Sequence, residues 1–162
     1  QKIALEENAD SFLVELAAWL HDLGDYKLHD GIDKSTELIT EFLTSQNIDS
    51  NTLQKVLDIV SQVSFSKGNL PTTLEAKIVQ DADRLDAIGA IGLARTFAYG
   101  GSKQREIYNP ENLNETTIQH FYDKLLKLKD LMNTDSARKI ADERHQYLED
   151  FLTRFYQEWE GQ

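Results

Sequence analysis

Cysteine is absent from the 162-residue chain, and proline occurs only twice. Without cysteine the chain has no disulfides and no thiolate metal ligands, and we expect a reducing, cytoplasmic environment. It has no run of about 18 consecutive apolar residues, so no membrane-spanning helix is predicted. Basic residues are few, 17 against 28 acidic ones, and the formal net charge is -11. Because nucleic-acid backbones bind to basic surfaces, we expect no general nucleic-acid binding.

A helical pattern fills the rest of the sequence. Apolar residues make up 40% of the chain and recur at helical spacing, and no β-branched alternation is long enough to predict a sheet. We expect an all-α fold, a compact multi-helix bundle forming one domain over residues 1–162. The N-terminal residues look like the end of a helix that begins before Gln1. Helices are expected at 1–7, 11–23, 34–46, 50–64, 72–88 continuing after Gly89 to Tyr99, 115–132 and 135–159.

Helix-terminating residues stand at most of these boundaries. Pro71 precedes Thr72 and Glu75, which predict a capping box with Thr72 as the N-cap. Gly100-Gly101 is expected to end the helix before it, and the polar loop that follows, up to Asn114, is long enough for a lid. The other expected terminators are Asp10 or Ser11, Asp33 and Asp49 at N-termini, and Gly24 at a C-terminus.

The helix at 11–23 is apolar in almost every direction, which predicts a place in the centre of the fold. It ends in His21-Asp22, with Asp25 one turn later. Ionisable groups carried into an interior are costly unless they are paired or bind a metal. This is a first indication of a functional site.

A second indication is the acidic segment 79–87. At 100° per residue, Asp83 shares a helix face with four alanines, and Asp86 lies beside it. A carboxylate on such a face can be approached closely by another helix. Asp81 points in a different direction and is expected in solvent. The four alanines are Ala76, Ala87, Ala90 and Ala94.

Together the two segments resemble the HD-domain superfamily of metal-dependent phosphohydrolases. The resemblance rests on residues 17–27 (AAWLHDLGDYK) and 80–87 (QDADRLDA), and it extends through 88–97 (IGAIGLARTF). It is similar in particular to a branch of small bacterial HD hydrolases with little assigned biology. About two-thirds of the chain is covered, and two long segments in order are far more specific than a bare His-Asp pair.

The resemblance implies a divalent metal site. In the family, a His on an earlier helix, the His-Asp pair and a later Asp hold the metal. His21 and Asp22 match the pair, and Asp83 matches the later Asp. No histidine precedes His21, so we expect that the N-terminal helix is missing from this sequence. If the sequence is complete, the site lacks one ligand.

The expected chemistry follows from these residue types. A mixed imidazole and carboxylate set suits Mn, Fe, Ni, Co, Zn or Mg and leaves positions for water and substrate. Such a metal would acidify water or polarise a phosphoryl oxygen. Asp25 or Asp86 could orient the water or take its proton. The candidate substrate-binding cations are Lys27, Arg84 and Arg95.

Several of these residues also have structural interpretations. Arg84 and Arg95 could equally form ion pairs within the fold, and Asp86 could simply stabilise its helix. Lys103 and Arg105 in the lid candidate could seek phosphate or be solvated. His29 could contact substrate, whereas His120 and His145 are expected to be ordinary. The apolar stripe of the last helix is either core or a homodimer contact: Tyr147, Leu148, Phe151, Leu152, Phe155 and Trp159.

The sequence therefore predicts a phosphohydrolase that cleaves a small phosphate ester or anhydride, such as a nucleotide. The alternative is a degenerate HD domain that binds a ligand or a protein without turnover. A purely structural bundle would explain the late helices but not the two ionisable segments.

Overall fold

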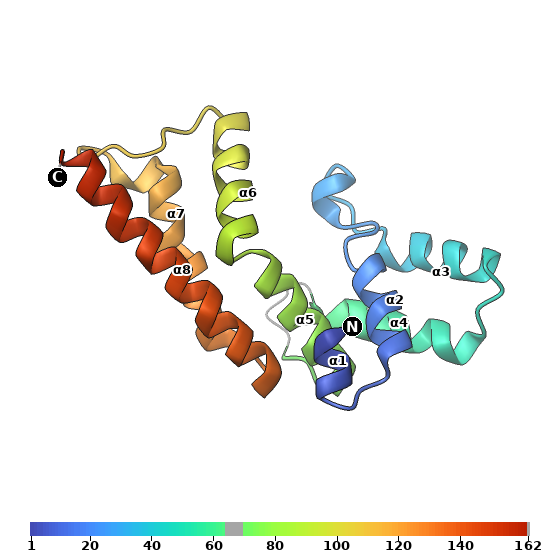
Figure 1. Cartoon of the computed structure of the whole chain (residues 1–162). Helices are drawn as coiled ribbons and strands as arrows, with labels where there is room; N and C mark the ends of the chain where they lie inside the picture. Colours follow the sequence, from blue (N-terminus) through green and yellow to red (C-terminus); the bar gives the residue numbers. More distant parts are fainter. Residues whose placement is uncertain (64–69, 162) are drawn as a thin grey trace. The chain divides into compact units, whose positions relative to one another are not determined.

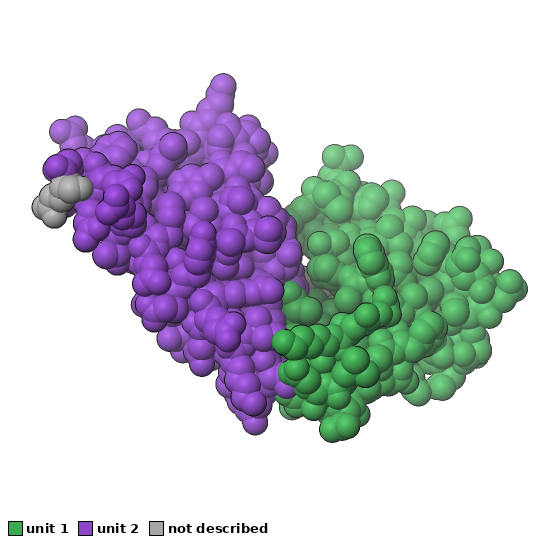
Figure 2. All heavy atoms as spheres, in the orientation of Figure 1, with its two compact units in different colours: residues 1–82 green, residues 83–162 purple. Residues whose placement is uncertain are grey.

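The computed structural model describes residues 1–63 and 70–161. Over these residues the chain forms eight α-helices and no strand, which confirms the all-α prediction. None of the described helices is both long and apolar enough to cross a membrane. The chain divides into two compact units, residues 1–82 (unit 1) and 83–162 (unit 2) (Figure 2). Ser64, the expected last residue of the fourth helix, lies outside the described residues.

Unit 1 is built around the pairing of α2 with α4, to which α1 and α3 add (Figure 1). Its core is aliphatic and includes Leu13, Val14 and Ala17 from α2 and Val56 and Ile59 from α4. The elements are α1 (Lys2–Glu6), α2 (Ser11–Leu20), the 3-10 turn η1 (Tyr26–Leu28), α3 (Ser35–Ser45), α4 (Ser50–Val63) and α5 (Leu74–Asp86), within which the boundary between the units falls.

Aspartates precede three of the unit 1 helices, α2, α3 and α4, as expected. Asp10 accepts hydrogen bonds from the backbone N–H groups of Phe12 and Leu13, both at 3.1 Å. Asp49 accepts from the backbone of Asn51 and Thr52 in the same way before α4, and Asp33 accepts from Ser35 before α3. Each bond satisfies an amide that has no partner within its own helix.

The capping box expected at α5 is wrong by one residue. Thr73, not Thr72, accepts a hydrogen bond from the backbone N–H of Ala76, at 3.2 Å. The Thr72 hydroxyl instead donates to the side-chain oxygen of Gln62. With Thr73 as cap, Glu75 is one position too early for the box, and its carboxylate accepts from the backbone of Asp10.

Helix α2 is not buried on all sides, so the prediction that it lies in the centre of the fold is wrong. Leu13, Val14, Ala17 and Leu20 are buried, whereas Trp19 is 80% exposed and Phe12 is 58% exposed. The buried residues follow the spacing of an amphipathic helix with one packed face. Composition alone could not reveal this, because the outward face of α2 also carries apolar residues.

The helix that contains Asp83 ends sooner than expected. After α5, Ile88 is extended and Gly89 has a φ of +77°, so the chain turns before α6 (Gly89–Ser102) begins. Ala90 and Ala94 therefore belong to a different helix from Asp83, and the predicted shared alanine face is wrong. Gly92 permits the turn, because a Cβ there would lie 2.3 Å from the carbonyl oxygen of Ala87.

Unit 2 is organised along α8 (Asp135–Trp159), which packs against α6 and the 3-10 helix η4 (Leu125–Leu131) (Figure 1). Helix α7 (Thr117–Asp123) contacts α6 and follows η3 (Leu113–Glu115). The single helix expected at 115–132 is thus two elements. Gly100 and Gly101 do not break α6 as predicted, because the helix continues through both to Ser102. Gly100 instead gives α7 room to approach, since a Cβ there would lie 2.3 Å from the Thr117 hydroxyl oxygen.

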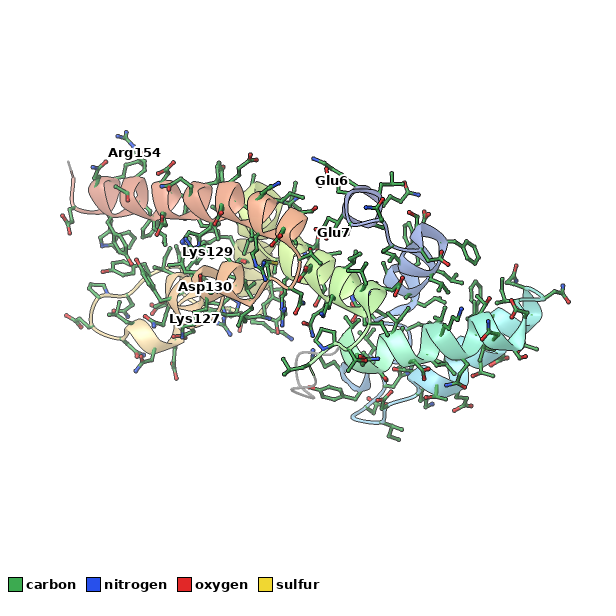
Figure 3. All side chains as sticks on the ribbon, turned by 90° about the horizontal axis from the view of Figure 1, so that it is seen from below. Glu6, Glu7, Lys127, Lys129, Asp130 and Arg154 are labelled. Carbon is green, nitrogen blue, oxygen red and sulfur yellow. The ribbon has the colours of Figure 1, made fainter. Side chains whose placement is uncertain are left out.

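The aromatic side of α8 lies largely within unit 2. Leu148 and Leu152 are buried, and the Phe151 ring stacks on Phe121 at 5.9 Å. The other sides of α8 and η4 carry charged groups, with Arg154, Lys127 and Asp130 among them (Figure 3). This arrangement confirms a core role for most of the stripe, although Tyr147 and Trp159 are about half exposed.

The lid-candidate loop is anchored at its middle. The backbone carbonyls of Glu106 and Ile107 accept hydrogen bonds from Thr117 and Ile118, at 2.8 and 3.0 Å. Between α6 and η3, the Tyr108 ring packs edge-on against three rings at the end of α8, with centroid distances of 5.1 to 5.8 Å. These rings belong to Phe155, Tyr156 and Trp159.

Candidate functional site

His21 is oriented by the helix it follows. Its Nδ1 lies 2.7 Å from the carbonyl oxygen of Ala18, in the last turn of α2. A carbonyl oxygen only accepts, so Nδ1 must carry the hydrogen and donate it. In the neutral ring the lone pair is then at Nε2, the atom through which a histidine so oriented binds a metal.

Asp22 lies against this nitrogen. Its Oδ2 is 3.3 Å from His21 Nε2, and the His21 side chain is 23% exposed. A carboxylate oxygen also only accepts, so the neutral ring and Asp22 direct lone pairs at each other. Either a proton on Nε2 or a cation that binds both atoms removes this repulsion. The pair therefore fits a divalent cation in its donor types, one imidazole nitrogen and one carboxylate oxygen.

A pocket of about 480 Å³, part of it open to solvent, adjoins His21 in unit 1. Asp25 lines it and accepts a hydrogen bond from the backbone of Lys27, which fixes the turn η1. Asp33 and Ser35 line the same pocket. The chain returns to the pocket because Gly24 turns it with a φ of +87°. The backbone N–H of Lys34 then donates a hydrogen bond to the Gly24 carbonyl at 2.9 Å.

Lys27 lies on η1 and is exposed, with its ammonium 5.5 Å from the centroid of the Tyr26 ring. Sequence reasoning noted Asp33 only as a helix cap and did not connect it with His21. The signal was present in the glycine at 24, whose left-handed conformation turns the chain so that the segment at 33–35 comes back beside it.

The residues predicted at the α5–α6 junction lie in unit 2. Asp83 and Asp86 are exposed on the last turn of α5, and Asp86 forms an ion pair with Arg95 of α6. The Arg84 guanidinium donates to the backbone carbonyl of Leu131. Of the two predicted arginines, one therefore ties α5 to the end of η4 and the other pairs with a predicted catalytic carboxylate. In the described part of the chain, no three His, Cys, Asp or Glu side chains are grouped as a metal site.

Asp81 was expected in solvent, and this is wrong. It is fully buried, and its neighbour Gln80 is 4% exposed and donates to the carbonyl of Gln62 at 3.3 Å. Ile78, Val79 and Gln80 are buried together with Asp81, so α5 is covered over a wide arc here. Asp81 points away from Asp83, as predicted, but that side of α5 is covered by protein and not by solvent.

A second pocket lies within unit 2, between α6 and α7. Arg95 and Tyr99 line it from α6, His120 and Lys124 from α7 and its end, and Arg105 from the loop. Sequence reasoning did not join these residues. The sequence does contain a signal for this grouping. Arg95 and Tyr99 are four residues apart, as are His120 and Lys124, and this spacing places each pair on one face of a helix.

Comparisons with known proteins agree on one family. A family model described as HD domain matches residues 1–88. The chain is 41% identical over 163 residues to the Bacillus subtilis protein YpgQ, named as uncharacterised, covering 98% of this chain and 78% of that protein.

Solved structures are similar over nearly the whole chain. The crystal structure of Bacillus subtilis YpgQ in complex with ADP has a TM-score of 0.84 and 39% identity, covering 97% of this chain and 81% of that one. An HD-superfamily hydrolase from Bacillus thuringiensis has a TM-score of 0.84 and 41% identity, with coverages of 99% and 80%.

Proposed function

The chain belongs to the HD-domain family, and from this premise we propose that it is a metal-dependent phosphohydrolase. Its proposed substrates are small phosphate esters or anhydrides. The observation that carries the proposal is the His21–Asp22 pair, in which a ring held through Nδ1 directs Nε2 toward a carboxylate oxygen at 3.3 Å. This combination supports metal binding more directly than a helix-capping role, because capping requires only the Nδ1 bond.

We propose His21, Asp22 and Asp83 as protein ligands of a divalent cation. When bound, the cation supplies Lewis-acid activation of the phosphoryl group. The Ala18 carbonyl holds the His21 ring in the required tautomer. Mn, Fe, Ni, Co, Zn and Mg are all compatible with this mixed nitrogen and oxygen set.

The remaining residues have proposed roles in proton transfer and phosphate binding. Asp25 lines the pocket beside His21 and is the candidate to accept a proton from the attacking water. Asp86 is the second candidate, and it forms an ion pair with Arg95 of α6. Lys27 has an exposed ammonium that could bind a phosphoryl oxygen, as could Arg95 and Arg84.

A nucleotide is the substrate class we favour within this proposal. Its support is the crystal structure of YpgQ in complex with ADP, a protein 39% identical to this chain. Binding of ADP by this relative supports recognition of a phosphorylated nucleoside.

The test combines metal analysis with hydrolysis assays on the full chain. We expect a stoichiometric divalent metal after loading, and release of phosphate or pyrophosphate from at least one nucleoside mono-, di- or triphosphate. Asp22→Ala and Asp83→Ala should each lose the metal and at least about 100-fold of the activity, with unchanged helical content by circular dichroism. Asp142→Ala, an exposed substitution on α8, is the matched control and should change neither quantity.

Two results would contradict the proposal in different ways. Full metal occupancy in both aspartate variants would exclude these ligands. A bound metal without hydrolysis of any phosphate substrate would instead favour the non-catalytic HD module as the function.

A further inference from the structure

A groove of unit 2 is lined by residues of α7, η4 and α8. It encloses about 730 Å³ of space that opens to solvent. Tyr122 lines it from α7, Leu126 from η4, and the other lining residues, Tyr156 among them, come from α8. Aromatic, aliphatic and acidic side chains of three elements therefore meet in one place.

Two carboxylates give this groove a negative charge. Glu149 and Asp150 line it, and among its described lining residues there is no lysine, arginine or histidine. Arg154 follows the lining residue Thr153 in sequence and forms an ion pair with Glu158. A cation that enters the groove is therefore attracted by two negative charges at short range.

The Glu149 carboxylate is held in place by a buried histidine. Its Oε1 lies 3.2 Å from Nε2 of His145, whose side chain is 10% exposed. A carboxylate oxygen only accepts, so Nε2 carries the hydrogen, and a neutral ring is sufficient for this bond. The contact with a neutral ring orients Glu149 and leaves its negative charge available to a ligand.

Polar hydrogens of the groove are directed at the protein itself. The Gln146 amide donates to Oδ1 of Asp150 at 3.1 Å, and the Thr153 hydroxyl donates to the backbone carbonyl of Glu149 at 2.9 Å. Because these donors are engaged, the groove offers a ligand mainly acceptors: carboxylate oxygens, the Gln146 side-chain oxygen and the Thr153 hydroxyl oxygen. The complementary ligand carries several N–H donors and positive charge.

Two tyrosines add aromatic surface. Tyr122 is 40% exposed. The pKa of Tyr156 is raised by burial first and then by its hydrogen bond with Tyr122, so this phenol keeps its proton. The faces of neutral aromatic rings attract ammonium groups, and Leu126 and Leu152 offer apolar surface to a methylene chain.

We propose that this groove binds a short aliphatic polyamine. Its ammonium groups donate charge-assisted hydrogen bonds to Glu149 and Asp150, and its methylene segments lie against the tyrosine rings and the two leucines. Neither a phosphate nor a carboxylate ligand fits, because the groove would repel both. The site goes beyond the proposed hydrolysis, since it lies in unit 2 and contains none of the residues proposed for that reaction.

The experiment is calorimetric titration of the full chain with spermidine at about 0.15 M NaCl, where charges more than about 8 Å apart are largely screened. We expect saturable 1:1 binding. Glu149→Gln and Asp150→Asn should each weaken it roughly three- to tenfold, because each removes one charged acceptor. Tyr122→Leu should weaken it roughly two- to fivefold, because it keeps an apolar side chain but removes the ring.

Asp142→Asn and Glu143→Gln are the matched controls. Each removes the same charge from an exposed position of α8, seven residues before Glu149 or Asp150, and neither position lines the groove. Seven residues correspond to about 10 Å along a helix, so each control should change the affinity less than about twofold. Thermal denaturation followed by circular dichroism checks that every variant is folded during the titration.

Parallel titrations identify the ligand chemistry. Uncharged 1,4-butanediol should not bind. An absence of spermidine binding would overturn the proposal, as would displacement of spermidine by an equal concentration of MgCl2 or equal losses in the groove and control variants, because both indicate a general attraction of cations to an acidic surface. Tighter binding of Nα-acetyl-lysine methylamide than of spermidine would also overturn it, since the groove would then accept a lysine side chain of a protein partner. The groove does not include His21 or Asp22, so failure of the proposed hydrolysis leaves this result unaffected.

Discussion

At the scale of single residues, the His21 ring is held by the backbone carbonyl three residues earlier. We predict that the neutral ring is the Nδ1-protonated tautomer, and that zinc addition shifts the resonance of Nε2 and not that of Nδ1. Two-bond proton–nitrogen correlation spectra at mildly alkaline pH distinguish the two nitrogens. A dominant Nε2-protonated tautomer would remove the observation on which the proposed metal site depends.

His120 gives a prediction with a definite sign. Its pKa is lowered in the folded protein, by burial and then by Lys124 and Arg105, so the unfolded chain binds the proton more readily. Stability is therefore lost as the pH falls through the ordinary value of 6.5. The Tm of His120→Asn should therefore fall less than that of the parent when the pH is lowered from about 8 to about 5.5.

The matched variant for this measurement is His29→Asn, because His29 lies in unit 1 and does not line the pocket that His120 shares with Lys124 and Arg105. Its Tm should fall with pH as steeply as that of the parent. Equal slopes in the parent and in His120→Asn would show that protonation of His120 does not oppose folding.

Among single residues, the sequence pointed to candidate site residues more readily than it predicted what surrounds them. His21 and Asp22 could be found because a rare residue pair ends a conspicuous helix. The burial of Asp81 could not, since it depends on elements that cover α5 over a wide arc. The pairing of Asp86 with Arg95 joins two helices across a turn at Gly89, and no helical periodicity extends through that turn.

At the scale of secondary-structure elements, α2 depends on its N-cap. Asp10 accepts from two backbone amides at 3.1 Å, so Asp10→Ala should lower the free energy of unfolding by about 1 kcal/mol. Asp10→Asn keeps an accepting oxygen and should have a much smaller effect. Urea denaturation of the two variants and the parent gives the comparison, and equal losses in both variants would contradict a capping role.

The contact between α6 and α7 is predicted to be limited by one methyl group. Gly100→Ala should be destabilising, because the new Cβ would lie 2.3 Å from the Thr117 hydroxyl oxygen. Removing that oxygen with Thr117→Ala should recover part of the loss, so the double variant should be more stable than the sum of the single changes implies. Additive effects in thermal denaturation would show that the two positions do not interact.

Helix positions were largely predictable because their ends carry local signals. Asp10, Asp33 and Asp49 precede helices in the structure as the sequence indicated. Gly100 was misread for a physical reason: glycine both ends helices and admits close neighbours, and only the presence of Thr117 distinguishes these uses. The same ambiguity affected α2, whose outward apolar residues look like core in a list of residue types.

At the scale of the whole molecule, the acidic balance of the chain limits its partners. The net charge of -11 predicts that duplex DNA does not bind, even though Arg95, Arg105 and Lys124 line one pocket of unit 2. Fluorescence anisotropy at low salt should show no saturable binding of a labelled duplex up to about 10 µM protein. Salt-sensitive binding below that concentration would mean that the basic residues form a continuous exposed surface.

The chain contains two tryptophans, and each unit holds one of them. Trp19 of α2 is 80% exposed. Trp159, the last residue of α8, has its ring centroid 5.1 Å from that of Tyr108. The emission spectrum should accordingly combine a long-wavelength component from Trp19 with a component from Trp159 that also receives excitation energy from Tyr108. Trp19→Phe leaves an optical signal specific to unit 2, and Trp159→Phe leaves one specific to unit 1. The intact chain thus carries an internal fluorophore for following each unit during unfolding or ligand binding, without any attached label.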